Sequence, residues 1–423
     1  MIKKILTLLL AIVITLSFGA LFACDSNSSQ GNGDGYVSAL PFGGDITPTS
    51  GTEGLEYKKN SDGTYAVSGI GSASTVKDIV IPSHYQNVLV TRIGFRAFYQ
   101  TKIESVVIPE GVTEIGERAF ERCFELKNVT LSKNINNVGS LAFWNCKKLN
   151  YNQYDNALYL GTQDNPYLAL INAVFSENDT ETTWVVIPTR AVTSCQINAD
   201  CEVIAGSAFE NCKNLTSITI PSKVKTIGSS AFRSCKKITS IILEGAINYI
   251  GSYAFFDSGV KTVKIGSSIT KIDLNAFSNA PITSFTVSEN NQNYSSYDGD
   301  LYSKDKKTLI RYASGKTDKS PIIPDFVEKL ENWAVQYSNN LEVVVVPETV
   351  TYLGNGVFSD CLNMKDITFS NSTAFYGTHI IFMSGIGNSK LANIYFNGTR
   401  EEWEALKLLF NPGSSTYTVY YLK

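Results

Sequence analysis

Cysteine is the residue type in this sequence with the widest chemistry, because a thiolate can attack a substrate, bind a metal or form a disulfide. The chain has eight cysteines and only two histidines, His84 and His379. The histidines lie far apart in the sequence, which argues against a histidine metal site or a Ser-His catalytic pair. The chemistry open to this chain therefore depends on where the cysteines fall.

Five cysteines share one position in a recurring phrase, three residues after a phenylalanine, as in "IGERAFERC" at 115–123. They are Cys123, Cys146, Cys212, Cys235 and Cys361. Copies of the phrase without cysteine hold Thr101, Ser258, Ala280 and Ser338 at that position. Redox or metal chemistry would not survive such replacement, whereas the packing of a small residue does. The position predicts buried free thiols, with disulfides between stacked repeats as the alternative.

Two further cysteines, Cys195 and Cys201, lie outside this position, in "CQINADC". In an exported chain such a pair can form a small-loop disulfide, whereas a bacterium living without oxygen would keep both reduced. The sequence has no H-E-x-x-H, G-x-S-x-G or P-loop motif. The acidic pair Asp298 and Asp300 falls in a turn region, where carboxylates accept backbone hydrogen bonds or face water. We therefore predict no catalytic residue, metal or cofactor.

The eighth cysteine, Cys24, follows a segment typical of a secretory signal, with a cationic start and an apolar run from Ile5 to Ala23. The ending "LFAC" resembles a bacterial lipobox, and this resemblance implies cleavage after Ala23 and a lipid on Cys24. An ordinary signal peptide or an uncleaved anchor is the alternative. We predict a signal peptide at 1–23, a flexible tether rich in Ser, Gly and Asn at 24–50, and a lipid-anchored protein at the bacterial cell surface.

Bulk composition indicates a folded chain and gives no sign of a nucleic-acid partner. Hydrophobic residues make up 43% of the 423 residues, charged residues 18%, and the net charge is −3. A chain of this length with this composition forms either several domains or a repeat array. The sequence lacks the basic clusters that bind polyanions.

A unit of 22 or 23 residues recurs through the body of the chain. Its phenylalanine falls at Phe98, Phe120, Phe143, Phe209, Phe232, Phe255, Phe277 and Phe358, and Val335 takes the same position. Each unit begins with an alternating stretch such as "TSITIP" at 216–221, whose isoleucines face one way and hydroxyl residues the other. Proline then ends strand pairing. Because one unit cannot bury its own apolar face, the period predicts a mainly β solenoid with parallel strands.

These units, from about residue 78 to 370, resemble leucine-rich repeats of the BspA type, also called Treponema pallidum-type repeats. The resemblance implies a right-handed leucine-rich-repeat array. It also implies a bacterial surface or secreted protein, since some members are reported to bind host matrix proteins or to act in adhesion. No catalytic residues come with the family.

Three segments depart from the repeat and read as hairpins, because two alternating runs flank a polar turn. The first, at 51–77, has Asp62-Gly63 at its turn and reads as an N-terminal cap. The others are insertions near 151–172 and 293–313, interpreted as structural, with a ligand-binding knob as the alternative. Residues 371–423 read as a C-terminal α/β cap with Thr399 and Glu402 in capping-box spacing.

The outward side of the strand row is the candidate binding face, because it is rich in hydroxyl groups and nearly neutral. Its residues are Ser105, Asn128, Thr130, Ser217, Thr219, Ser240, Thr262, Lys264, Ser284, Thr286, Asp366 and Thr368. The alternative is that Ser and Thr occur there through β-propensity alone.

Three functional classes remain open at this point. The leading hypothesis is a non-catalytic surface protein whose solenoid binds a protein or glycan, with membrane attachment through the N-terminal lipid. A self-associating envelope scaffold is the second. A β-helix enzyme acting on polysaccharides is the third, but it would need acidic or basic residues clustered across neighbouring coils, which the hydroxyl-rich face does not show. The sequence leaves the oligomeric state open.

Overall fold

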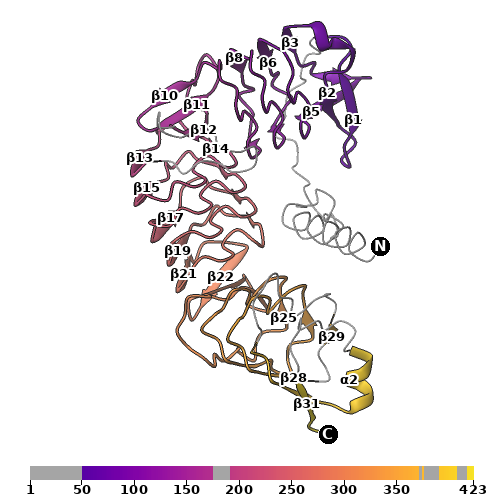
Figure 1. The fold of residues 1–423 in the computed structure, drawn as a ribbon, viewed down its shortest axis with the longest axis vertical. Helices are drawn as coiled ribbons and strands as arrows, with labels where there is room; N and C mark the ends of the chain where they lie inside the picture. Colours follow the sequence, from indigo (N-terminus) through magenta and orange to yellow (C-terminus); the bar gives the residue numbers. More distant parts are fainter. Residues whose placement is uncertain (1–49, 175–190, 371–373, 376–389, 407–416) are drawn as a thin grey trace, which may run out of the picture. The chain divides into compact units, whose positions relative to one another are not determined.

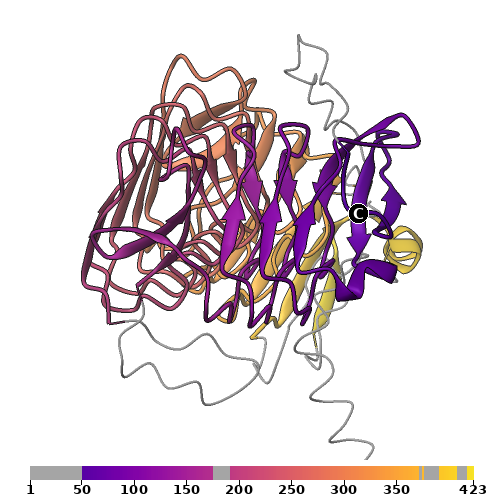
Figure 2. The same ribbon diagram turned by 90° about the horizontal axis from the view of Figure 1, so that it is seen from above.

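Parallel strands stack coil upon coil through the described part of the chain, with almost no helix. The computed structural model describes residues 50–174, 191–370, 374–375, 390–406 and 417–423, all within the compact unit Pro48–Lys423. The predicted β-solenoid is confirmed. Figure 2 shows neighbouring coils side by side, with their strand arrows pointing the same way.

Each coil contributes a strand to a first row, here called the long-strand row, whose members have three to five residues. They are β3 (Asp78–Val80), β6 (Ser105–Val107), β8 (Asn128–Thr130), β13 (Ser194–Gln196), β15 (Ser217–Thr219), β17 (Ser240–Leu243), β19 (Thr262–Ile265), β21 (Ser284–Val287), β26 (Val343–Val345), β28 (Asp366–Ser370), β30 (Asn393–Asn397) and β31 (Thr418–Tyr421). Strands from β13 to β21 succeed one another in Figure 1. Hydrogen-bonded pairing divides this row into four sheets.

Each coil also contributes to a second row, the short-strand row, which consists mostly of two-residue strands at the Ile-Gly turn. Its members are β5 (Val88–Ile93), β7 (Glu114–Ile115), β9 (Asn137–Val138), β14 (Val203–Ile204), β16 (Thr226–Ile227), β18 (Tyr249–Ile250), β20 (Lys271–Ile272), β25 (Lys329–Leu330), β27 (Tyr352–Leu353) and β29 (Ala374–Phe375). The row is divided among three sheets, and within each of them neighbouring members pair in parallel with equivalent residues opposite each other, as in Ile227↔Ile250.

The recurring phrase forms two tight turns in each coil. In "IGERAFERC", Arg118 and Arg122 have φ angles of 56° and 62°. Equivalent residues of the next coils repeat this left-handed backbone, which Asn and Asp tolerate better than most residues. Accordingly, the second of the two positions is most often Asn or Asp, namely Asn145, Asn211, Asp257, Asn279 and Asp360, and otherwise Gln100, Arg122, Ser234 or Tyr337.

The phrase also builds the core. Phe232 stacks on Phe209 and on Phe255, with 5.2 Å between ring centroids in both pairs. The Phe232 amide donates a 2.7 Å hydrogen bond to the carbonyl of Ala254 in the next coil. Gly228 allows this close stacking, because a Cβ there would lie 2.4 Å from the Gly206 backbone nitrogen. Ring stacking and backbone bonding thus repeat together along the array.

All three predicted hairpins are present, and each continues into the short-strand row. At the N-terminus, β1 (Glu56–Lys59) pairs antiparallel with β2 (Tyr65–Gly69), and β2 pairs in parallel with β5. A short 3-10 helix (Gly71–Thr75) follows β2, and β4 (His84–Tyr85) pairs antiparallel with β5.

Both internal insertions have three strands where the sequence predicted two. The first contains β10 (Asn152–Tyr154), β11 (Ala157–Leu160) and β12 (Ala169–Ala173). The second contains β22 (Tyr294–Tyr297), β23 (Asp300–Ser303) and β24 (Thr308–Arg311). The last strand of each pairs in parallel with the next short strand, so the insertions are built into the solenoid.

Beyond residue 370 the long-strand row continues through β30 and β31, which pair in parallel. The helix α2 (Arg400–Leu406) begins with the predicted capping box. The Glu402 amide donates to Thr399 Oγ1 at 3.2 Å, and the Thr399 amide donates to Glu402 Oε2 at 2.7 Å. Trp403 on this helix is buried, as the apolar spacing predicted.

Candidate functional site: the long-strand face

The predicted binding residues lie in two lanes along the long-strand row. In the parallel register, Thr262 lies between Ser240 and Ser284, and Lys264 lies between Ile242 and Thr286. Residues between the lanes, such as Val263, point into the core. We call the two lanes together the long-strand face. The structure brings the predicted residues together within each sheet, but the breaks in the row separate Ser105, Asn128 and Thr130 from the later strands.

Several residues of the long-strand face are already hydrogen-bonded to neighbours. Ser105 donates to Asp78 at 2.5 Å, and Asp366 accepts from Asn393 at 2.7 Å. Lys264 pairs with Glu244 at 2.8 Å. These contacts stabilise the stack, so a partner would meet mainly the remaining hydroxyl and apolar side chains.

The C-terminal part of the long-strand face is more apolar than the hydroxyl-rich face predicted from the sequence. One lane runs through Ile322, Val345, Thr368, Tyr395 and Tyr420. Ile322 is 90% exposed, and Tyr395 and Tyr420 stack with ring centroids 5.1 Å apart. This lane was not predicted, because β30 and β31 lie in the segment interpreted as a cap.

The cysteine position of the repeat is filled by buried thiols, as predicted. Cys123, Cys146 and Cys235 donate to the carbonyl of the phenylalanine position one coil earlier, at 2.9 to 3.2 Å. Thr101 takes the cysteine position in its coil, and its Oγ1 donates to the Phe98 carbonyl of the same coil at 2.9 Å. Among the described residues all seven cysteines are free, so none of the disulfides considered between coils is formed.

The disulfide considered between Cys195 and Cys201 is not formed either, since both thiols are free and buried. Cys195 lies in β13 with its side chain in the core, and Cys201 Sγ donates to the Val203 carbonyl at 3.4 Å. Burial raises the pKa of both thiols to about 12, so both remain protonated at neutral pH. The proposed lipid site, Cys24, lies outside the described residues, as does His379.

Thiol labelling will test this arrangement. In a Cys24→Ser variant we expect Ellman's reagent to find almost no reactive thiol in the native protein and seven after unfolding in guanidinium. Burial shields all seven thiols, and the raised pKa values of Cys195, Cys201 and Cys361 further suppress their reactive thiolate forms. If two fewer thiols than expected react after unfolding, then Cys195 and Cys201, or a pair of stacked cysteines, form a disulfide.

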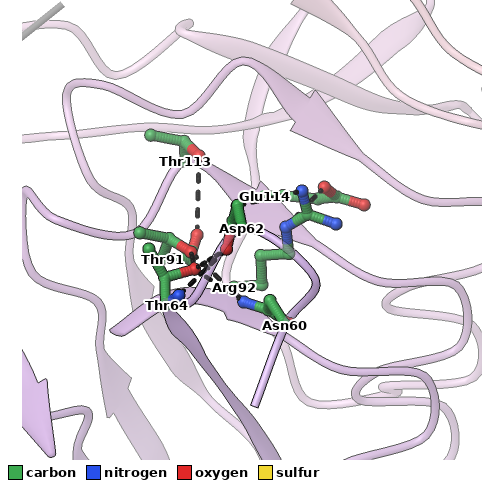
Figure 3. Close-up of polar contacts among 7 residues, drawn as sticks. All are labelled: Asn60, Asp62, Thr64, Thr91, Arg92, Thr113 and Glu114. Carbon is green, nitrogen blue, oxygen red and sulfur yellow. Dashed lines mark hydrogen bonds and ion pairs between the residues drawn. The ribbon is translucent and has the colours of Figure 1, made fainter. Parts of the chain in front are cut away.

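A cluster of ionisable and hydroxyl side chains lies near the N-terminal hairpin, and Figure 3 shows it. Its members are Asn60, Asp62, Thr64, Thr91, Arg92, Thr113 and Glu114. Asp62 accepts from Thr64 Oγ1 at 2.6 Å, and Thr64 and Thr91 share a hydrogen bond of 2.8 Å. Burial opposes ionisation of Asp62, but hydrogen bonds from Thr64 and the nearby Arg92 outweigh it and lower its pKa. These groups satisfy one another, so the cluster ties the hairpin turn to the first coils.

Two glutamates join three coils each on the solvent side. Glu104 pairs with Lys77 and Lys127, both at 2.6 Å, and Glu342 pairs with Lys319 and Lys365. Hydrogen bonds from the lysines lower the pKa of each glutamate from 4.5 to about 2. Each folded-state pKa lies below the unfolded value, so these pairs stabilise the fold above the unfolded pKa and lose their effect as pH falls.

We expect the urea midpoint to fall as pH is lowered from about 4.5 to 2, the interval between the ordinary and lowered pKa values. A Glu104→Gln/Glu342→Gln variant should lose less stability across that interval, and added salt should reduce the difference. Equal pH dependence of the two proteins would show that other carboxyl groups dominate acid unfolding.

In the described part of the chain, no three His, Cys, Asp or Glu side chains gather closely enough to hold a metal ion. Within the same residues, no helix has the length and apolar character needed to cross a bilayer.

The repeats of this solenoid match a known protein family. The BspA type leucine-rich repeat region matches in six copies, over residues 72–163, 188–298 and 315–401. The chain belongs to this family. The matched family is a repeat family rather than an enzyme family. Among proteins with curated functions, none matches the chain.

Solved structures similar to this BspA-type chain are bacterial leucine-rich repeat proteins. A leucine-rich cell surface protein from Faecalibacterium prausnitzii is 22% identical, with a TM-score of 0.43, and the match covers 88% of this chain and 100% of that one. A leucine-rich repeat protein from Eubacterium ventriosum is 18% identical, with a TM-score of 0.41 and coverages of 88% and 83%. The pneumococcal vaccine antigen PcpA is 16% identical, with a TM-score of 0.38 and coverages of 89% and 99%.

Proposed function

We propose that this BspA-type protein is a non-catalytic cell-surface protein that binds a protein or glycan partner, with a role in adhesion. The observation that carries the proposal is the long-strand face, where exposed side chains repeat in register from one parallel strand to the next. A solenoid presents such a face over many coils, so an extended partner can contact several units at once. The family supports this role, since BspA-type proteins are typically surface proteins.

Attachment to the membrane is proposed through a lipid on Cys24, displayed on the tether at 24–50. In the native bacterium, the wild-type chain should incorporate radiolabelled fatty acid, whereas Cys24→Ala should not and should be released or mislocalised. A wild-type chain that never takes up label would exclude the lipid anchor and leave the ordinary signal peptide or the uncleaved anchor.

The binding function is tested with the full chain in detergent, captured on a surface and presented with a panel of matrix proteins and polysaccharides. We expect saturable binding to at least one of them, weakened in a Thr219→Glu/Thr262→Glu variant, because both residues are exposed on the long-strand face. Light scattering on the same sample separates the rival class: self-association without any ligand would favour a structural scaffold.

A further inference from the structure

An exposed apolar stripe crosses the C-terminal part of the long-strand face. It consists of the lane Ile322, Val345, Thr368, Tyr395 and Tyr420, here called the C-terminal lane. Ile322 is 90% exposed, Val345 53% and Tyr420 45%. Leu422, two residues after Tyr420 and on the same side of the chain, is 55% exposed. Contiguous exposed apolar side chains of this kind mark interaction sites on soluble proteins.

The exposure of Ile322 follows from a break in the long-strand row. Ile322 forms a single parallel bridge with Val345, so Pro321 occupies the position that Val344 fills in the next coil. Proline has no N–H donor and cannot continue a strand ladder. Among the described residues, no strand pairs with Ile322 on the side of β21. That side of Ile322 is therefore open to solvent, and the C-terminal lane begins there.

The C-terminal lane offers contact area but few hydrogen-bonding groups. The side chains of Ile322 and Val345 have no donor or acceptor, and the rings of Tyr395 and Tyr420 stack on each other with centroids 5.1 Å apart. A sugar hydroxyl group covered by an aliphatic side chain loses its hydrogen bonds to water without replacement, which costs binding energy. Apolar side chains of a protein gain from the same contact. The lane therefore favours a protein partner over a glycan.

The spacing of the C-terminal lane selects the conformation of the partner. Neighbouring strands lie roughly 4.8 Å apart, so the lane repeats at about that interval. Side chains on one face of an α-helix recur about every 5.4 Å along its axis, whereas those on one face of an extended chain recur about every 6.7 Å. Over the four steps of the lane a helix drifts out of step by about 2 Å and an extended chain by about 8 Å. A helix lying across the strands therefore fits the lane better.

Acidic side chains flank the C-terminal lane on the side where its strands end. Asp325 and Glu348 occupy equivalent positions in neighbouring coils, three residues beyond the lane, and both are exposed. Glu348 accepts a 2.8 Å hydrogen bond from Asn397, which lies on the same outward side of β30 as Tyr395. The Glu348 carboxylate is thereby held beside the lane. The lysines on the opposite flank already pair with Glu342, so the flank that attracts a charged partner is the acidic one.

We propose that the C-terminal lane binds an amphipathic helix of a protein partner, with the apolar stripe of the helix on the lane and basic side chains over Asp325 and Glu348. Residues at i, i+4, i+7 and i+11 of such a helix form one apolar stripe. They pack along Ile322, Val345 and the tyrosine pair, and the helix axis runs across the strands. This inference rests on the proposed binding function and assigns it a place and a class of partner.

A synthetic peptide tests the proposal directly. It is alanine-rich, about 15 residues long, with leucine at i, i+4, i+7 and i+11 and lysine along one side of that stripe. The controls are a scrambled peptide of the same composition and a peptide with glutamate in place of lysine. The full chain is captured on a surface and measured below the critical micelle concentration of its detergent, so that micelles do not compete for the peptide. We expect saturable binding of the lysine peptide, with both controls weaker by about tenfold or more.

Variants of the chain locate the contact. Ile322→Thr/Val345→Thr keeps the branched side chains but removes apolar surface, and it should weaken binding of the lysine peptide about tenfold. Ile242→Thr is the matched control, because Ile242 is 58% exposed at the equivalent strand position. Its neighbour in register is Lys264, so Ile242 belongs to no apolar stripe on that side. This control should bind the peptide like wild type.

Charge reversal tests the orientation of the helix. In Asp325→Lys/Glu348→Lys the glutamate peptide should bind more tightly than the lysine peptide, the reverse of the wild-type order. All the exchanged side chains are on exposed residues, so the urea midpoint of each variant should stay close to that of wild type. An unchanged order would show that the basic side of the helix does not lie over these carboxylates.

Other outcomes overturn the proposal in defined ways. If Ile322→Thr/Val345→Thr binds the lysine peptide as tightly as wild type does, the C-terminal lane is not the contact. If wild type binds a matrix protein or a polysaccharide but not the peptide, the helix assignment is wrong while the proposed function stands. If light scattering shows a dimer that the same double variant loses, the lane binds a second copy of the chain instead. If wild type binds neither the peptide nor any matrix protein or polysaccharide, the proposed function fails as well.

Discussion

Phe232→Ala should lower the free energy of unfolding by about 3–5 kcal/mol, the range for deleting a buried aromatic side chain. Phe232 has no exposed surface and stacks between Phe209 and Phe255. The flanking coils are held at a fixed spacing by backbone hydrogen bonds, such as Phe209 N to Ala231 O at 2.7 Å. The coils therefore cannot collapse into the space that the ring leaves, and the cavity term is added to the lost burial.

Urea unfolding of the wild type and two alanine variants measures this effect. Phe124→Ala is the matched control, because Phe124 is 44% exposed and should change stability by about 0.5 kcal/mol or less. Hydrogen exchange should show the loss of protection centred on the coils that contain Phe209 and Phe255, since a solenoid couples mainly neighbours. A loss below about 1 kcal/mol would mean that the phenylalanine column is not what holds the coils together.

Much of the fold could be predicted from the sequence because one short phrase encodes one coil. Phe120, Gly116 and Cys123 recur with the same neighbours in other copies of the phrase. In each copy the phenylalanine fills the core, the glycine lies at the turn, and the small residue packs in the interior. The cysteine position was predictable for the same reason. A position that also accepts Thr101 or Ala280 is defined by size, and the structure shows it filled by small side chains that are buried, except for the half-buried Thr101.

The packing of the second insertion against the solenoid could not be predicted, because it depends on contacts between segments that do not repeat. Tyr312 and Asp300 come from the insertion, while Pro321 and Val344 come from the coils that follow it. One signal was present in the sequence: Pro321 stands where the repeat places a buried strand residue, which predicts a break in the sheet. Asp300 was interpreted as a turn carboxylate that accepts backbone hydrogen bonds or faces water. It does accept from the Ala313 amide at 2.8 Å, but it is buried, and burial raises its pKa to about 6.

Arg311→Met should lower the free energy of unfolding by about 2–4 kcal/mol, because the guanidinium is a buried link between the insertion and the coils on both sides. Arg311 lies at the end of β24 and is only 5% exposed. It donates to the Trp333 carbonyl at 2.5 Å, to the Leu274 carbonyl, and to Ser278 Oγ at 3.3 Å. Burial lowers its pKa to about 10, so it still carries its charge at neutral pH.

Methionine fills much of the same space but supplies no donor, so the Leu274 and Trp333 carbonyls lose their partner in the interior. Arg311→Lys should also destabilise, because a lysine ammonium cannot reach several acceptors with the planar fork of arginine and is more strongly hydrated. Arg233→Met is the matched control: Arg233 is exposed and pairs with Glu210 at 3.5 Å, so its loss should cost about 1 kcal/mol or less. Equal stability of Arg311→Met and wild type would mean that these buried hydrogen bonds do not help to hold the insertion on the solenoid, whereas the expected loss would show that Arg311 links β24 to the coils on both sides.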